Sequence, residues 1–493
     1  MLTTLFPFTR TTKKLLRFEW KGHLFEFNAL PNGLAAAPRL FTRLLKPVFA
    51  TLREAGHIST VFLDDSLLIG YSEWECIMNV RESLCAISSA GFIVHPVKSV
   101  FTPTQQIQYL GVVIDSESMT VKLTQERMDS LKQSCHELLQ VHCPSVREVA
   151  EVVGKIVASF PAVQYGPLHY RSLERDKIEA LKCNKGDFDS QMTLSEGSKQ
   201  ELEWWCANVH SACKTIGIKD PEVVVFTDSS LSGWGCVCEG TSTGGHWLPL
   251  EKAFHINYLE IKAALMALKC FAPQLHGKHV RLMIDNTIAV HCINNLGTNH
   301  SASCNDITLA LWNWCTSHNI WVSAAHIPGK NNVIADAESR RVNLDAEWKL
   351  NSKLLKSAFE SLAVSPSIDL FATRLNTQMN RYVSYRPDPD AVAIDAFSIS
   401  WKDLNFYAFP PFSVIPLVLN KVQQEKGAGI IVVPEWKTQS WFPVLLRLLQ
   451  APPVRLSCRQ RLLQLPSYPD RIHPLIQKRN LHLLVCRISS VTS

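Results

Sequence analysis

Four acidic residues between positions 223 and 336 could together hold metal ions, namely Asp228, Glu260, Asp285 and Asp336. Two of them close apolar runs and two lie where helices are expected to begin. This order predicts that they gather at one edge of a sheet. Carboxylates that close repel one another unless cations lie between them. A pair of Mg²⁺ or Mn²⁺ ions, which prefer oxygen ligands, would fit the cluster and would suit a phosphodiester displacement.

Apolar runs are expected to form the strands that position the first and third acids. Val223–Asp228 and Val280–Asp285 each end in their aspartate, a pattern that predicts buried strands. Gly233–Cys238 predicts another strand, and the turn-rich residues 240–245 precede a possible third.

The second and fourth acids lie in segments with helical signals. Asn257–Phe271 has apolar residues at helical spacing, with Glu260 near its start. His326–Asp336 contains a Pro-Gly turn that leads into a helix start. Taken alone, any one of these acids would more often be a solvated surface charge.

These motifs resemble the ribonuclease H domain of retroelements. The matching residues are Thr227-Asp228-Ser229-Ser230, Tyr258-Leu259-Glu260, Ile284-Asp285-Asn286 and the segment from His326 to Asp336. The resemblance implies that Asp228, Glu260, Asp285 and Asp336 bind two Mg²⁺ or Mn²⁺ ions. It also implies that His326 is a mobile residue for proton transfer or product release, and that the substrate is the RNA of an RNA–DNA hybrid.

A second acidic motif lies near the start of the chain. Asp64 and Asp65 separate the apolar stretches of Ser59–Ile69, which predicts a hairpin with both carboxylates at its tip. An acidic tip on apolar strands is suited to a metal ion, although an ordinary turn would show the same pattern. Upstream, residues 15–27 predict a strand, a Gly-His turn and a strand, and residues 30–41 predict a turn that opens a helix of small residues.

Together these segments resemble the palm of a reverse transcriptase. Phe62-Leu63-Asp64-Asp65 resembles its Tyr-x-Asp-Asp box, and residues 30–41 resemble its Pro-x-Gly-Leu…Pro nucleotide-pocket segment, with Asn32 in place of Phe. Residues 91–111 resemble the motifs that follow, including the primer grip. The resemblance implies Asp64 and Asp65 as metal ligands and template RNA and primer DNA as partners. The implied pocket residues are Pro31, Gly33, Leu34, Pro38, Arg39, Lys98, Leu110 and Gly111.

One departure from the reverse transcriptase pattern affects its chemistry. That family has a further metal-binding aspartate upstream, whereas no aspartate precedes Asp64 in this sequence. We therefore expect an N-terminally truncated or frame-disrupted copy. Losing one ligand of a two-metal site should remove most polymerase activity.

The region after the ribonuclease H motifs has a mixed α/β pattern. Residues 365–450 resemble the extra domain of DIRS-type retrotransposons, which is similar to adenine methyltransferases. Phe409-Pro410-Pro411-Phe412 stands where those enzymes have Asp-Pro-Pro-Tyr, so we expect a structural or nucleic-acid-binding appendage rather than methyl transfer. Asp369 and Asp395 are either ligands in this domain or loop caps.

Net charge and cysteine content limit which classes of protein the chain can belong to. The chain has a net charge of +6, and the seven basic residues between Arg455 and Arg487 face one acid, which predicts a basic tail that contacts phosphates or is simply solvated. The 15 cysteines include no Cys-x-x-Cys pair, so we expect reduced thiols and an intracellular protein of the cytoplasm or nucleus. No apolar run is long enough for a membrane span.

The expected fold is multidomain, α/β and α+β. The predicted parts are partial fingers and palm (1–120), a helical thumb or connection (121–215), a ribonuclease H-like domain (220–345), the methyltransferase-like appendage (365–450) and the basic tail (451–493). The expected function is that of a DIRS-type retrotransposon polyprotein fragment that has kept ribonuclease H activity. The alternative is a catalytically decayed remnant that only binds nucleic acid.

Overall fold

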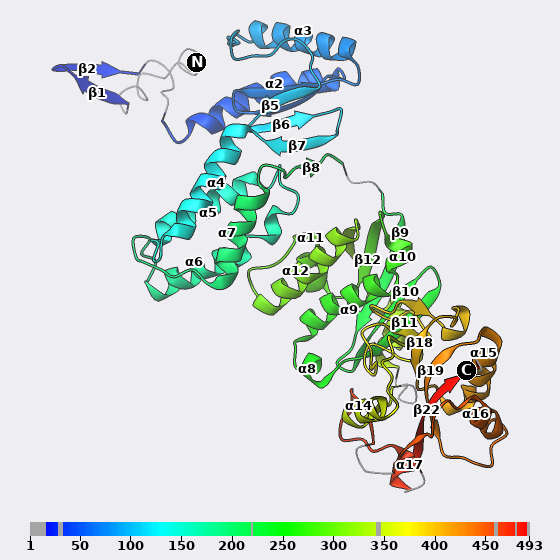
Figure 1. Ribbon diagram of the computed structural model, residues 1–493. Helices are drawn as coiled ribbons and strands as arrows, with labels where there is room; N and C mark the ends of the chain where they lie inside the picture. The colour runs from blue at the N-terminus through cyan, green and yellow to red at the C-terminus, as the bar shows by residue number, and fades with distance from the viewer. Residues whose placement is uncertain are drawn as a thin grey trace. The chain divides into compact units, whose positions relative to one another are not determined.

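The computed structural model describes residues 16–27, 33–217, 220–341, 347–457, 462–478 and 481–490 (Figure 1). The chain divides into two compact units. The first comprises Met1–His169 and Glu179–Ile218, and the second comprises Tyr170–Ile178 and Lys219–Ser493. No helix within these described ranges has both the length and the apolarity that crossing a lipid bilayer requires.

The first described element of the first unit is a β-hairpin. β1 (Arg17–Trp20) and β2 (His23–Glu26) pair across Lys21 and Gly22, whose φ angles are 51° and 77°. Glycine adopts this left-handed region without strain. The turn therefore lies one residue earlier than the Gly-His turn that the sequence predicted.

The predicted acidic hairpin is present in the same unit. β3 (Ile58–Phe62) and β4 (Asp65–Ile69) are antiparallel, with Phe62 opposite Asp65, so Leu63 and Asp64 form the turn. Two helices pack on this hairpin, α2 (Ala37–Glu54) and α3 (Glu73–Ser89). The helix predicted within residues 30–41 thus begins at Ala37.

A four-stranded sheet and several helices complete the first unit. The strands, in spatial order, are β5 (Gln106–Tyr109), β6 (Val112–Asp115), β7 (Thr120–Leu123) and β8 (Lys214–Thr215). The helices are α4 (Gln125–Gln140), α5 (Val146–Ser159), α7 (Glu196–Asn208) and α6 (Arg171–Cys183), the last of which crosses the division between the units. The helices predicted at 124–141 and 146–158 are confirmed by α4 and α5.

The second unit contains a five-stranded mixed sheet. Its spatial order is β11 (Thr241–His246), β10 (Gly233–Cys238), β9 (Val223–Ser229), β12 (His279–Ile284) and β13 (Trp321–His326). The first three strands pair antiparallel, and β9, β12 and β13 run parallel. The strands predicted from the apolar runs are confirmed. The turn-rich residues 240–245 were predicted to precede the third strand. In the structure they form most of that strand, β11.

Helices pack against this sheet. The main ones are α9 (Ile256–Cys270), α11 (Thr287–Asn294), α12 (Ala302–Ser317) and α13 (Val333–Arg340), with two one-turn helices, α8 (Pro249–Lys252) and α10 (Ala272–Leu275). α9 contacts β9 and β10, and most of its residues are buried, because α12 packs against it as well. α13 contacts β9, β10 and β11.

Glycines explain why α13 can lie so close to the sheet. A Cβ on Gly235 would lie 2.2 Å from the carbonyl oxygen of Ala335, and one on Gly233 would lie 3.0 Å from that of Ser339. A Cβ on Gly244 would lie 3.0 Å from the carbonyl oxygen of Glu338. Only residues without a side chain allow this approach. These glycines make the third strand look like a turn in the sequence.

A second sheet lies in the C-terminal part of this unit. Its spatial order is β15 (Ile368–Asp369), β18 (Asn405–Ala408), β19 (Ala428–Pro434), β22 (Leu483–Ser489) and β20 (Val454–Leu456). The first three strands are parallel, and β22 is antiparallel to both β19 and β20. Two-stranded pairs are formed by β14 (Lys349–Leu350) with β21 (Leu463–Gln464) and by β16 (Val383–Ser384) with β17 (Ala393–Ile394).

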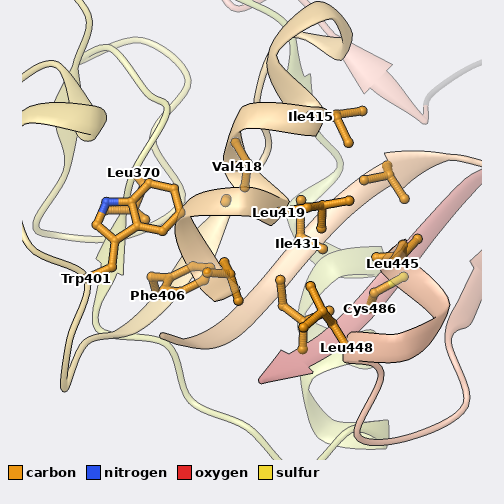
Figure 2. Close-up of a cluster of buried hydrophobic side chains, with 14 of the residues drawn as sticks. Leu370, Trp401, Phe406, Ile415, Val418, Leu419, Ile431, Leu445, Leu448 and Cys486 are labelled. Atoms are coloured by element: carbon orange, nitrogen blue, oxygen red, sulfur yellow. The ribbon is translucent and has the colours of Figure 1, made fainter. Parts of the chain in front are cut away.

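Helices and two apolar core clusters accompany the C-terminal sheet. The helices are α14 (Ser352–Ser361), α15 (Ile415–Glu425), α16 (Phe442–Leu448) and α17 (Pro474–Gln477). Figure 2 shows part of one cluster, in which Val418 and Leu419 of α15 lie with Ile431 of β19 and Cys486 of β22.

The prediction of a basic tail over residues 451–493 is wrong for the described residues of that range. Residues 483–489 form a strand between β19 and β20, with Val485, Cys486 and Ile488 buried. Pairing on both edges and burial of this apolar run outweigh the charge of Arg487, which is exposed and whose Nη1 donates a hydrogen bond of 3.4 Å to the carbonyl oxygen of Leu362. The C-terminal sheet therefore extends beyond residue 450.

Candidate active site

Three of the four acids predicted as metal ligands meet at one edge of the first sheet of the second unit. Asp228 lies near the end of β9, and Asp285 directly follows the neighbouring parallel strand β12. Glu260 lies in the second turn of α9, which packs across β9. One ligand oxygen from each of the three lies within 4.8 Å of the others.

Burial and mutual repulsion perturb two of these carboxyl groups. Burial, followed by the charges of Asp228 and Asp285, raises the pKa of Glu260 to about 9. Burial also raises the pKa of Asp228, against a hydrogen bond from Ser339 that lowers it, and the charges of Asp285 and Asp336 raise it further. The charge of Arg340 lowers the pKa of Asp228 in turn, but it is the smallest of these effects and does not reverse the rise.

The donor set fits a divalent cation. Glu260 Oε2 is buried and has no hydrogen-bond partner, although a buried carboxylate oxygen is normally paired. A hard cation bound by the three carboxylates would satisfy this oxygen and relieve the repulsion between the acids. The residues present therefore fit the Mg²⁺ or Mn²⁺ that the sequence predicted.

Asp336 and His326 lie close to this cluster in the fold but outside the group of three. Asp336 is on α13 and forms an ion pair with Arg340 at 2.6 Å, with 40% of its side chain exposed. His326 ends β13 opposite Ile284, the residue before Asp285, and is exposed. A carboxylate and an imidazole that both reach solvent thus lie on elements next to the cluster.

Two further residues that the sequence did not single out support the cluster. Ser339 Oγ donates a hydrogen bond of 2.6 Å to Asp228 Oδ2. Asn332 is buried and its Nδ2 donates to the carbonyl oxygen of Thr227, which ties the start of α13 to β9. Ser339 lies three residues after Asp336 and so one helical turn along the same face. That spacing is the only sequence signal that could have indicated it.

The polymerase-like acids are placed differently. Asp64 and Asp65 are both exposed at the hairpin tip. Burial raises the pKa of Tyr109 and the charge of Asp65 raises it further, so Tyr109 lies near this tip. Among the described residues, the only group of three or more possible metal ligands within 4.8 Å is the one in the second unit. Within the part of the chain that the structure describes, no third ligand lies with Asp64 and Asp65.

The predicted nucleotide-pocket residues lie on the surface of the first unit where they are described. Pro31 lies outside the described residues. The exposed members are Gly33, Pro38, Arg39, Lys98 and Leu110, and the half-buried ones are Leu34 and Gly111. Leu110 and Gly111 have φ angles of 49° and 79° and form the turn between β5 and β6. A Cβ on Gly111 would lie 2.0 Å from Cζ of Arg127, so this glycine makes room for a basic side chain.

The two aspartates of the C-terminal part are held by backbone amides. Asp369 is buried and accepts hydrogen bonds from the amides of Phe371 and Gln378, and burial raises its pKa to about 7. Asp395 accepts from the amide of Phe397 and caps a short 3₁₀ helix. These contacts match the loop-cap interpretation of the two residues.

Comparison with known proteins identifies the N-terminal part. Residues 2–114 match the family model described as reverse transcriptase (RNA-dependent DNA polymerase). The enzymatic polyprotein of cauliflower mosaic virus (strain D/H) is 23% identical over 341 residues, which are 66% of this chain and 46% of that protein. Polyprotein P3 of Commelina yellow mottle virus is 22% identical over 347 residues, 66% of this chain and 17% of that protein. The aligned region thus spans less than half of these relatives.

A transposon protein and two solved structures are also similar. The Tf2-3 polyprotein of Schizosaccharomyces pombe is 26% identical over 118 residues, 24% of this chain and 8% of that protein. A foamy viral protease–reverse transcriptase in complex with double-stranded DNA is 17% identical, covers 66% of this chain and 56% of its own, and has a TM-score of 0.38. RNase H1 from Halobacterium salinarum is 18% identical, covers 23% of this chain and 92% of its own, and has a TM-score of 0.20.

The sequence matches agree with the reverse transcriptase resemblance of residues 62–65 and 91–111, which lie inside the matched region. The polyprotein alignments cover about two thirds of the chain and so continue well past that region. The chain therefore contains a reverse transcriptase domain over residues 2–114 and is related to the polyproteins of retroelements.

Proposed function

We propose that this chain hydrolyses the RNA strand of RNA–DNA hybrids at the carboxylate cluster of its second unit. The observation that carries the proposal is the meeting of Asp228, Glu260 and Asp285 within 4.8 Å, together with the unpartnered buried oxygen of Glu260. Relatedness to retroelement polyproteins agrees with a substrate of this kind. The hybrid, its template RNA and its primer DNA are the proposed partners, and the proposed location is the cytoplasm or nucleus.

The proposed cofactor is a pair of Mg²⁺ or Mn²⁺ ions. Asp228, Glu260 and Asp285 would hold them, and Asp336 would join from α13 once its ion pair with Arg340 opens. When bound, such ions activate a water molecule and stabilise the charge on the leaving 3′ oxygen. The ions would also replace protons on Glu260, because a carboxyl group with a raised pKa must deprotonate to bind a cation.

The chain's own groups have separate tasks in this proposal. Ser339 and Asn332 keep Asp228 and the end of β9 in place through their hydrogen bonds. His326 is exposed at the end of β13, where it can exchange a proton with the substrate or with solvent.

The proposal assigns no polymerase activity to a protein made of these residues alone. Asp64 and Asp65 are present and exposed, but no aspartate precedes them in the sequence, and no third ligand lies with them among the described residues. Two-metal phosphoryl transfer needs more carboxylate oxygens than this hairpin supplies. We expect no primer extension from the purified chain.

We also propose that the parent element is of the DIRS type. This rests on the resemblance of residues 365–450, in which Phe409-Pro410-Pro411-Phe412 directly follows β18, the central one of three parallel strands. Methyl transfer is not part of the proposal, because Phe409 replaces the acid of the corresponding motif. The proposed domain limits are those predicted from the sequence, except that the described parts of residues 451–493 belong to the C-terminal fold.

Hybrid cleavage by the purified chain tests the proposal. A labelled RNA–DNA hybrid is incubated with Mg²⁺ or Mn²⁺, with single-stranded RNA as substrate control and deoxynucleotides in a parallel primed reaction. Asp285→Asn removes one ligand charge at nearly constant shape, and Asp220→Asn serves as a control on an exposed acid that precedes β9. We expect hybrid-specific cleavage that is lost in Asp285→Asn and kept in Asp220→Asn. Metal-dependent binding without cleavage would instead support the decayed, nucleic-acid-binding remnant.

A further inference from the structure

The C-terminal part of the second unit covers the outer edge of the nuclease-like sheet. Thr243 of the edge strand β11 donates a hydrogen bond of 2.6 Å to the carbonyl oxygen of Pro387. Arg386 Nη2 donates to the carbonyl oxygen of Ser242 at 2.9 Å, and Arg374 Nη2 to that of His246 at 2.9 Å. An edge strand that would otherwise be open is thus occupied by groups from the loops after β15 and after β16.

Arg386 also reaches the helix that borders the carboxylate cluster. Its Nη2 lies 2.9 Å from Glu338 Oε1 of α13, with side-chain exposures of 21% and 10%. The same Glu338 oxygen accepts from Ser242 Oγ at 3.1 Å and lies 3.3 Å from the mostly exposed Arg341. Glu338 Oε2 is buried without a hydrogen-bond partner. Arg386 is therefore the main buried counter-charge of a nearly buried carboxylate.

The position of Glu338 is coupled to the cluster through one turn of helix. The next residue, Ser339, donates the 2.6 Å hydrogen bond to Asp228, and Asp336 lies two residues before Glu338. Backbone atoms of Ala335 and Ser339 sit directly on Gly235 and Gly233. No side chain lies between the backbone of α13 and the sheet at these glycines, so nothing there can absorb a movement of the helix. A displacement at Glu338 therefore moves Ser339 and Asp336 as well.

We propose that Arg386, a residue of the C-terminal part, is a positioning residue for the nuclease site. It neutralises Glu338 and so keeps α13 seated on the sheet, with Ser339 and Asp336 in place beside Asp228. Without Arg386, the Glu338 carboxylate has to move toward solvent, because a buried charge without its partner is strongly unfavourable. This inference rests on the proposed hydrolysis for its catalytic meaning, but the coupling itself can be measured without activity.

Four variants of the full chain separate the ion pair from other effects. Arg386→Met removes the charge and keeps most of the apolar stem, whereas Arg386→Lys retains a cation. Arg386→Met combined with Glu338→Gln removes both charges and tests whether the two residues act as a pair. Lys269→Met is the matched control, since Lys269 is also 21% exposed and pairs with Asp390 of the C-terminal part at 2.9 Å, away from α13.

Two readouts are taken for each variant. The first is the Mg²⁺ concentration that gives half-maximal hybrid cleavage, measured separately from the rate at saturating Mg²⁺. The second is amide hydrogen exchange across α13, which needs no catalysis. We expect Arg386→Met to raise the half-maximal Mg²⁺ concentration by about tenfold, the usual effect of losing a group that orients metal ligands, and to speed exchange in α13. Arg386→Lys and the double variant should stay near the wild type, as should Lys269→Met.

Several outcomes would overturn the inference. An unchanged Mg²⁺ requirement and unchanged α13 exchange in Arg386→Met would show that the ion pair positions nothing. Equal losses in Arg386→Met and Lys269→Met would assign the effect to general docking of the C-terminal part. If the wild-type chain cleaves no hybrid, the proposed function fails, and exchange alone then decides. Faster α13 exchange confined to the Arg386→Met single variant supports the coupling, and unchanged exchange refutes it.

Discussion

The packing of α13 on bare glycine makes Gly235→Ala the sharpest single perturbation of this protein. The added Cβ would lie 2.2 Å from the carbonyl oxygen of Ala335, 2.5 Å from the amide nitrogen of Ser339 and 2.8 Å from Cβ of Glu338. Ordinary contact begins at 3.4 Å, so α13 must move by 3.4 minus 2.2, about 1.2 Å. Neither obstructing backbone atom can rotate away, so the whole helix has to shift.

The consequences for stability and for activity can both be estimated. Forcing a methyl group into such a contact costs about 1–3 kcal/mol of unfolding free energy. A displacement of roughly 1 Å in a catalytic arrangement can lower the rate about 100-fold. We therefore expect Gly235→Ala to remain folded, to lose about two orders of magnitude in hybrid cleavage and to need more Mg²⁺.

The matched control is Gly154→Ala. Gly154 lies within α5 of the first unit, and no heavy atom lies within 4 Å of an added Cβ. Alanine should stabilise that helix by up to about 1 kcal/mol and leave cleavage unchanged. Denaturant unfolding and initial cleavage rates are measured for both variants. Wild-type cleavage by a folded Gly235→Ala protein, with normal protection of the α13 amides, would refute the reasoning from this close contact.

Three further changes test the electrostatics of the two sheets. Ser339→Ala removes the 2.6 Å hydrogen bond to Asp228. The Mg²⁺ concentration needed for half-maximal cleavage should rise about tenfold, and an Mg²⁺ dependence identical to that of the wild type would contradict this. Glu260→Gln should match the metal-free stability of the wild type near pH 4.5 and exceed it increasingly as pH rises to about 9, because the raised pKa keeps this carboxyl group protonated in the folded chain while it ionises in the unfolded chain. The same variant should abolish the Mg²⁺-induced rise in unfolding temperature. Asp369, whose pKa is raised by burial from 3.8 to about 7, favours the folded state when protonated, so its contribution is lost as pH rises through that range. Asp369→Asn should therefore gain stability over the wild type as pH rises from about 4 to about 7, and an equal difference at both ends would argue against a buried neutral acid.

Local sequence patterns determined most of the framework around the carboxylate cluster. The apolar runs that end near Asp228 and Asp285 form adjacent parallel strands, and the helical spacing around Glu260 forms α9. Burial of apolar side chains at strand and helix periods dictates these elements, so they are visible without a structure. The acidic hairpin at Asp64 and Asp65 was predictable for the same reason.

Long-range packing decided what the sequence pattern left hidden. β11 is rich in threonine and glycine and looks like a turn, because its glycines serve the close approach of α13. The apolar strand at residues 483–489 was obscured by the basic residues around it, although it pairs on both edges within the C-terminal sheet.

The carboxylate cluster shows the same division. The sequence by itself determined which residue types could bind a metal ion and on which elements they lie. Only the tertiary structure decided that Asp228, Glu260 and Asp285 come within 4.8 Å of one another, while Asp336 pairs with Arg340. It also decided that Ser339, 111 residues from Asp228, donates to it, and that Arg386 neutralises Glu338. Such contacts depend on how separate elements dock, and no local pattern of apolar and polar residues encodes that docking.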